Sequence, residues 1–146
     1  MAQLVVVAEN QERKLAERIM PGVPVLECGV GALNIMQALR NIPLDTEIIN
    51  IGYVGSSNFE IGTQVEIGEC RLYHPNVTYP EPVFHLAGDT LCFTGVDFVL
   101  ESKERDCVFD MELAFICGMG FRSVRSIKIV SDNLSLHEYH QVGAGV

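Results

Sequence analysis

Three carboxylates of this chain stand beside apolar segments, where they could do chemistry together. Asp110 and Glu112 precede an apolar run at residues 113–119, and Asp132 follows a β-rich run at 127–130. Buried carboxyl groups can divide acid and base roles, because burial and neighbouring charges move their pKa values apart. In open α/β sheets, ligands bind at the carboxyl ends of the strands. The pattern therefore predicts that these acids meet in one crevice.

A helix, a turn and a strand must position these acids. Residues 113–119 are long enough for a buried helix, and Gly118 and Gly120 indicate its end. A short basic turn follows, and the run that ends before Asp132 has the Ile and Val content typical of a strand. The order helix, turn, strand, carboxylate is the one expected of an α/β protein.

Each acid also has a structural interpretation. Asp110 and Glu112 could complement the positive end of a helix. Asp132 could cap a following helix through residues 133–135. A fourth acid, Glu12, lies in a predicted helix and could be solvated on its surface, which is the commonest environment of a Glu.

The rest of the chain divides into alternating strands and helices. Strands are predicted at residues 4–8, 23–26, 47–51, 65–73, 83–86 and within 90–100, and helices at 9–20, 32–40 and 136–142. Pro75, Pro80 and Pro82 predict a rigid loop. The alternation favours an α/β fold with three layers, α/β/α, around a mixed central sheet. No linker or repeat interrupts the pattern, so we predict a single domain over residues 1–146.

Composition excludes several function classes. The 146 residues are 48% hydrophobic and 20% charged, as in globular proteins. A net charge of -9 argues against nucleic acid and anionic membranes as partners. The N-terminal segment is predicted to be a strand and not a signal peptide, and no run approaches the length of a membrane span. The five cysteines form no CxxC pair and predict a reduced, cytoplasmic protein.

Two short motifs have a modest chemical meaning. Gly29 and Gly31 follow a predicted strand, where glycines let the backbone approach an anion. Asn34 occupies the third glycine position of GxGxxG, so from this motif alone we favour a tight strand-to-helix turn. His137 and His140 have no acidic or cysteine partner in register, and we therefore predict no metal site.

Four ordered blocks carry a family resemblance. They are residues 28–32 (CGVGA), 48–55 (IINIGYVG), 65–74 (VEIGECRLYH) and 110–132, which begins with DME and ends with SD. Together they resemble the nucleoside phosphorylase and nucleosidase superfamily, particularly the methylthioadenosine/S-adenosylhomocysteine nucleosidases, as a shortened member. The resemblance implies a phosphorylase/hydrolase-like fold, a purine nucleoside as the small-molecule ligand, no cofactor, and a homodimer or larger homo-oligomer.

The resemblance also implies a role for each candidate residue. Asp132 corresponds to the general acid that protonates the purine, and Glu12 to the residue that orients the attacking water. Glu112 corresponds to the carboxylate that binds the ribose hydroxyls. The implied substrate-binding set is Met111, Glu112, Ser131, Leu91 and Cys92, and the implied loop set is Gly29, Gly31, Tyr53 and Gly55.

Two functions remain open at this point. The first is an enzyme, a purine nucleosidase or nucleoside phosphorylase that cleaves the N-glycosidic bond. Hydrolysis is favoured over phosphorolysis, because the family's phosphorylases carry Arg and Ser where this chain has Asn50 and Tyr53; phosphate is a ligand only in the less favoured case. Tyr53 is also expected to fill the space where phosphate or water would stand. The second is a trimmed, catalytically weak nucleoside-binding or structural member of the same fold.

Overall fold

The computed structural model describes residues 2–74, 76 and 81–143 of the chain. Its elements follow one another in the order β1 (Gln3–Val7), α1 (Asn10–Ile19), β2 (Val25–Glu27), α2 (Ala32–Leu39), β3 (Glu47–Gly55), β4 (Gln64–Leu72), β5 (Val83–His85), β6 (Thr90–Thr94), β7 (Cys107–Asp110), α3 (Leu113–Gly118), β8 (Ser123–Asp132) and α4 (Leu136–Gly143).

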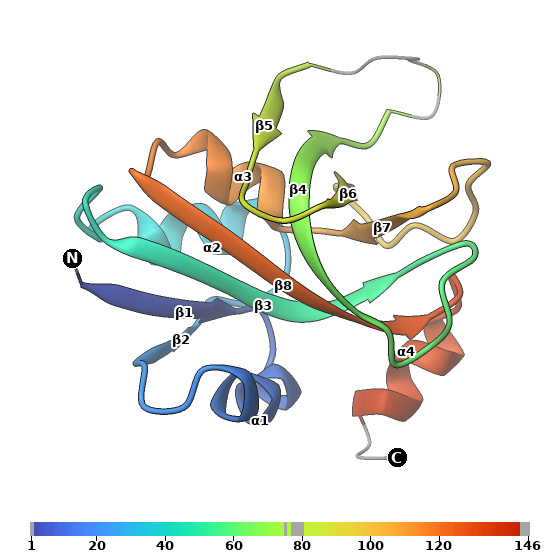
Figure 1. The fold of residues 1–146 in the computed structure, drawn as a ribbon, viewed down its shortest axis with the longest axis horizontal. Helices are drawn as coiled ribbons and strands as arrows, with labels where there is room; N and C mark the ends of the chain where they lie inside the picture. The colour runs from blue at the N-terminus through green and yellow to red at the C-terminus, as the bar shows by residue number, and fades with distance from the viewer. Residues whose placement is uncertain (1, 75, 77–80, 144–146) are drawn as a thin grey trace.

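Two long strands, β3 and β8, run parallel through the middle of the sheet (Figure 1). β1 and β2 extend the sheet beyond β3 in the parallel sense. On the other side, β8 pairs with β4, β4 with β6, β6 with β7, and β7 returns to β3, so the pairings form a closed circuit. The β3–β8 register ends with Gly55 opposite Asp132, after a bulge at Val54. This register brings two candidate site residues together.

Helices cover both faces of the sheet. α1 packs Leu15 and Ala16 against β1 and β3, while α2 and α3 pack Ile35 and Ile116 in a separate cluster that contains Val6 and Ile48. Neighbouring residues of one strand point to opposite faces, so each Val and Ile of these strands is buried under one helical layer or the other. The predicted three-layer α/β/α fold with a mixed sheet is confirmed.

The main difference from the sequence prediction lies before α3. Residues 107–110 form a buried strand, β7, so Asp110 ends a strand instead of opening a helix. β3 and β8 are longer than predicted: β3 continues to Gly55, and β8 begins at Ser123 and continues to Asp132. Pro75 and Pro80 of the predicted rigid loop lie outside the described residues.

The five cysteines are free thiols, and Cys70, Cys92 and Cys107 are buried. The cytoplasmic location inferred from them stays a prediction. Within the described part of the chain, no helix combines the length and the apolar character needed to cross a membrane.

Candidate active site

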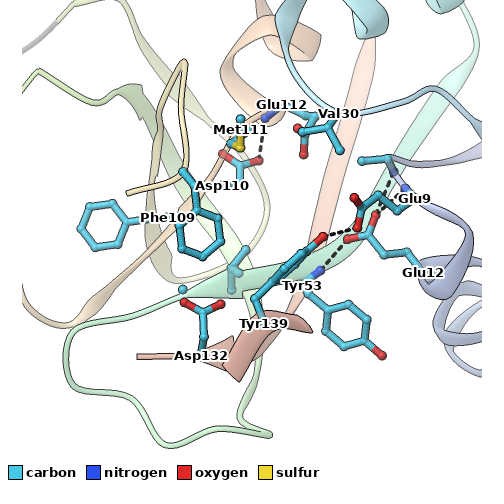
Figure 2. Close-up of a pocket in the computed structure, with 14 residues that line it drawn as sticks. Glu9, Glu12, Val30, Tyr53, Phe109, Asp110, Met111, Glu112, Asp132 and Tyr139 are labelled. Atoms are coloured by element: carbon cyan, nitrogen blue, oxygen red, sulfur yellow. Dashed lines mark hydrogen bonds between the residues drawn. The ribbon is translucent and has the colours of Figure 1, made fainter. Parts of the chain in front are cut away.

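A cavity of about 110 Å³ lies where β3, β7 and β8 end beside the start of α1 (Figure 2). Its lining residues are Ala8, Glu9, Glu12, Val30, Tyr53, Val54, Gly55, Phe98, Phe109, Asp110, Met111, Glu112, Asp132 and Tyr139. The predicted crevice at the carboxyl ends of the strands is therefore present, and it gathers Asp132, Glu12 and Glu112, which lie far apart in the sequence.

Asp132 is the last residue of β8, and its side chain is fully buried. One carboxyl oxygen accepts the Ser131 hydroxyl at 2.7 Å, and the other accepts the Ser135 N–H at 3.2 Å, so the structural capping role is also present. Burial raises the pKa of this carboxyl, although both hydrogen bonds oppose the shift. Asp132 can therefore carry a proton closer to neutral pH than a solvated Asp does.

Gly55 is required beside this acid. A Cβ atom at Gly55 would lie 2.9 Å from Asp132 Oδ2, which is shorter than ordinary contact. The glycine that ends the second sequence block thus leaves space for the carboxyl group that ends the neighbouring strand.

Glu12 is also buried, with 4% of its surface exposed, so its interpretation as a solvated surface residue is wrong. Its Oε1 accepts the N–H groups of Ala8 at 2.8 Å and Glu9 at 3.2 Å. Its Oε2 accepts the N–H of Tyr53 at 2.8 Å. Burial raises the pKa of Glu12, and the backbone N–H groups partly oppose it. The carboxylate is held rigidly between α1 and β3, as a base or a water-orienting group requires.

Glu112 follows β7, and its side chain contacts the glycine turn at residues 29–31. Its Oε2 accepts the N–H of Gly31 at 2.9 Å. Burial and the adjacent Asp110 raise the pKa of Glu112 to about 8. Gly29 and Gly31 have φ values of 90° and 91°, a region that favours glycine. The N–H at Gly31 that could have met a phosphate therefore binds a carboxylate of the same chain.

Lys128 is one component of the site that was not predicted from the sequence. It lies in the middle of β8 with 1% of its surface exposed. Its Nζ donates to Asn50 Oδ1 at 2.5 Å and to Asp110 Oδ2 at 3.3 Å. Burial lowers the pKa of Lys128, but Asp110 and other nearby acidic groups outweigh that effect and keep the pKa above its ordinary value. A lysine inside the run Ile-Lys-Ile-Val was the available signal, because a strand buried on both faces normally has apolar residues throughout.

Asp110 connects this cation to the rest of the site. It accepts the Thr94 hydroxyl at 2.5 Å and the N–H of Leu113 at 2.8 Å, in addition to Lys128. The contact with Leu113 is the helix-capping role considered for this acid. Lys128 also opposes the upward pKa shifts of Glu12 and Glu112 through its charge. Lys128 thus pairs with Asp110, and its charge also acts on Glu12 and Glu112.

Neither the protein-family models nor the curated proteins compared with this sequence give a match. Solved structures do resemble it. A nucleosidase (MTAN) of Chlamydia trachomatis bound to MTA aligns over 99% of this chain and 89% of its own, at 17% identity and a TM-score of 0.76. The methylthioadenosine/S-adenosylhomocysteine nucleosidase of Neisseria meningitidis, in complex with methylthio-immucillin-A, aligns over 96% and 90%, at 18% identity and 0.75. The chain has the fold of these nucleosidases. The structural resemblance implied by the four sequence blocks is confirmed.

Two predicted substrate contacts do not lie on the cavity wall of this nucleosidase fold. Leu91 packs in an aromatic cluster with Phe93 and Phe109. Cys92 is fully buried, and its sulfur points to Asp110 at 3.4 Å. Both side chains belong to β6, which is separated from the cavity by β7, so their prediction as base contacts is not supported. Met111 does line the cavity.

The prediction that Tyr53 fills the space for phosphate or water is also corrected. The ring of Tyr53 points away from Asp132 and Glu112 (Figure 2) and packs on the cluster beneath α1. Tyr139 of α4 instead crosses the cavity, where its hydroxyl donates to Glu9 and its ring packs edge-on against Phe98 at 5.7 Å. This contact was not predictable from local sequence, because 130 positions separate the two residues.

Proposed function

We propose that this chain hydrolyses the N-glycosidic bond of a purine nucleoside. The supporting observation is that one cavity contains Asp132, Glu12 and Glu112, three carboxyl groups whose pKa values are all raised by burial. Solved structures with this fold include nucleosidases crystallised with MTA and with 8-aminoadenine. Perturbed carboxyl groups in a cleft are typical of acid–base sites.

The chemistry assigns a different task to each acid. A purine leaves more easily when it is protonated, and Asp132 can supply that proton because burial favours its neutral form. Glu12, fixed by three backbone N–H groups, orients the attacking water and accepts its proton. Glu112 accepts hydrogen bonds from the ribose hydroxyls, and Met111 contacts the sugar. The carboxylate of Glu12 also stabilises positive charge that develops on the sugar ring in the transition state.

Water is favoured over phosphate as the nucleophile. Among the described residues that line the cavity there is no Arg or Lys, and Lys128 beneath it is engaged by Asn50 and Asp110. The N–H of Gly31 donates to Glu112. A phosphate dianion would therefore meet carboxylates without the cationic donors that phosphate sites use.

The test is base release from inosine, adenosine, methylthioadenosine and S-adenosylhomocysteine, each with and without phosphate. Hydrolysis predicts the free sugar of each substrate, which is ribose for inosine and adenosine and the 5′-substituted ribose for the other two, and no dependence on phosphate. Asp132→Asn should lower turnover by about 10²-fold or more, since a proton donor of this kind contributes that much. Release that requires phosphate, with ribose 1-phosphate as product, would contradict the hydrolytic assignment.

The alternative is a trimmed, catalytically weak member of the same fold with a nucleoside-binding or structural role. The observation that favours it is the small cavity, about 110 Å³, whereas pockets for drug-sized ligands have roughly 300–1,000 Å³. Nucleosides that raise the melting temperature without any base release would support this alternative.

We also propose that the chain assembles at least as a homodimer. Apolar side chains on and before α2 are exposed, namely Leu33 at 69%, Met36 at 50% and Val30 at 38%. Grouped apolar exposure of this kind is typical of an interaction surface. Light scattering at micromolar concentration should give at least twice the monomer mass; a stable monomer would contradict this proposal.

A further inference from the structure

A hydrogen-bonded pair, Glu9 and Tyr139, spans the cavity and is not used in the chemistry proposed above. The Tyr139 hydroxyl donates to Glu9 Oε2, and Gln11 Nε2 donates to the same oxygen at 2.5 Å. Burial and the neighbouring Glu9 raise the pKa of Tyr139, so its hydroxyl keeps its proton at neutral pH. Figure 2 shows the ring of Tyr139 directed across the cavity towards Glu9. A carboxylate on the cavity wall thus binds a phenolic hydroxyl.

The proposed roles leave one part of a nucleoside for Glu9 to contact. Asp132 lies at the purine, Glu112 at the 2′- and 3′-hydroxyls, and Glu12 at the water that attacks C1′. The substituent at C5′ is the remaining polar group of the sugar. Glu9 lines the same cavity as these three acids, beside Glu12 at the start of α1. The 5′ substituent would therefore point to the carboxylate of Glu9.

The Tyr139 hydroxyl occupies the Glu9 oxygen that a ligand hydroxyl would use. A ligand hydroxyl that reaches Glu9 Oε2 must therefore displace the phenol, and Glu9 then loses its hydrogen bond to Tyr139. A 5′-hydroxyl replaces that bond, whereas a 5′-thioether has no proton to donate.

We propose that Glu9 selects purine nucleosides that carry a hydrogen-bond donor at C5′, the unmodified 5′-hydroxyl nucleosides, over 5′-thioether and 5′-deoxy nucleosides. This selectivity rests on the proposed function and names its substrate class. The similar nucleosidases are named instead for 5′-methylthioadenosine and S-adenosylhomocysteine. A hydrogen bond to a charged group corresponds to about 10- to 100-fold in affinity, so the expected preference has that size. Nucleoside 5′-phosphates are excluded, because Glu9, Glu12 and Glu112 would face the phosphate.

The test compares adenosine, 5′-deoxyadenosine, 5′-methylthioadenosine and adenosine 5′-monophosphate, which share one base. Both kcat/KM for adenine release and the dissociation constant from calorimetry are measured. Adenosine is expected to exceed the 5′-deoxy and 5′-methylthio compounds by about 10-fold or more in either quantity. The monophosphate is expected to show neither release nor binding.

Two variants separate Glu9 from Tyr139. Glu9→Met should abolish the preference for adenosine, since it removes the acceptor and leaves an apolar side chain of similar length. Glu9→Gln should give a smaller preference than the wild type, because a neutral acceptor remains. Tyr139→Phe should improve binding of adenosine and of 5′-deoxyadenosine alike and leave their ratio unchanged, because the phenol competes with both. Circular dichroism identifies any variant that fails to fold, and the wild-type comparison stands without the variants.

The outcomes distinguish this proposal from the proposed function. Adenine release with equal or better use of the 5′-methylthio compound overturns the selectivity and leaves the hydrolase assignment intact. Binding in the expected order without any release supports the selectivity and overturns the hydrolase assignment. Absence of both binding and release overturns both.

Discussion

Replacement of Lys128 by Met tests whether the buried cation sustains the site. Its Nζ lies 3.3 Å from Asp110 Oδ2, and both side chains are almost fully buried. At an effective dielectric constant of about 20, that distance corresponds to about 5 kcal/mol of attraction. Removal of one member of a buried pair usually costs about 3–5 kcal/mol, because the other charge is left without a partner. We expect Lys128→Met to lower the free energy of unfolding by that amount near neutral pH.

The loss should depend on pH in a defined direction. In the wild type the charge of Lys128 lowers the pKa values of Glu12 and Glu112. Both pKa values therefore rise further in the Lys128→Met variant. Protonation of Glu12 and Glu112 removes their unfavourable buried charge, so the difference between variant and wild type should be smaller near pH 5 than near pH 8. Urea unfolding followed by circular dichroism at several pH values measures it.

Two controls accompany this experiment. Lys14→Met removes an exposed lysine and should change stability by no more than about 0.5 kcal/mol. The double variant with Lys128→Met and Asp110→Asn should be less destabilised than the sum of its single variants, as expected for interacting partners. A loss below about 1 kcal/mol, a loss independent of pH, or additivity in the double variant would refute the reasoning.

Further predictions concern the acids themselves. The pKa of Glu112 is about 8 in the folded protein against an ordinary value of 4.5, so its stabilising contribution is complete below pH 4.5 and is lost as pH rises through 8. The free energy of unfolding of Glu112→Gln should therefore rise relative to the wild type by up to about 1.4 kcal/mol per pH unit across that window, as measured by urea unfolding. A difference that stays constant with pH would contradict this prediction. Because Asp132 acts protonated, kcat should fall as pH rises through its raised pKa, whereas a flat profile would exclude it as the acid. Gly52→Ala places a Cβ 2.7 Å from Glu12 Oε2 and should reduce base release at least 10-fold by displacing the carboxylate, while Gly118→Ala, with 3.9 Å to its nearest neighbour, should retain activity.

Local sequence predicted much of the fold because most elements are marked by their own residues. The Val and Ile runs of β1, β3 and β8 and the apolar side of α2 lie where the pattern predicted them. β7 was missed because it has only four residues, which is too short for a periodic pattern, and highly charged residues precede it. Element type was therefore predictable where a run was long, and element ends were not.

The site was predictable only in part, for a related reason. The position of Asp132 at a strand end follows from local pattern, but the burial of Glu12 arises because Gly52 and Tyr53 of β3 lie against it. The contact of Tyr139 with Glu9 depends on how the last helix returns to the first. Such contacts are set by sheet order and register, and one sequence does not specify them.

The position of Lys128 explains how Glu12 and Asp132, two carboxyl groups with raised pKa values, can act as base and acid. Glu12 lies within the influence of Lys128 and accepts three backbone N–H groups, all of which favour its ionised form. Asp132 ends β8, four positions after Lys128, and its pKa is raised by burial against hydrogen bonds from Ser131, Ser135 and Leu134, with a smaller upward contribution from the charge of Glu138. Environments that separate two carboxyl pKa values assign the base and the acid. A second cation close to Asp132 would strengthen the fold by pairing a buried charge, but it would also remove the proton that the leaving purine needs.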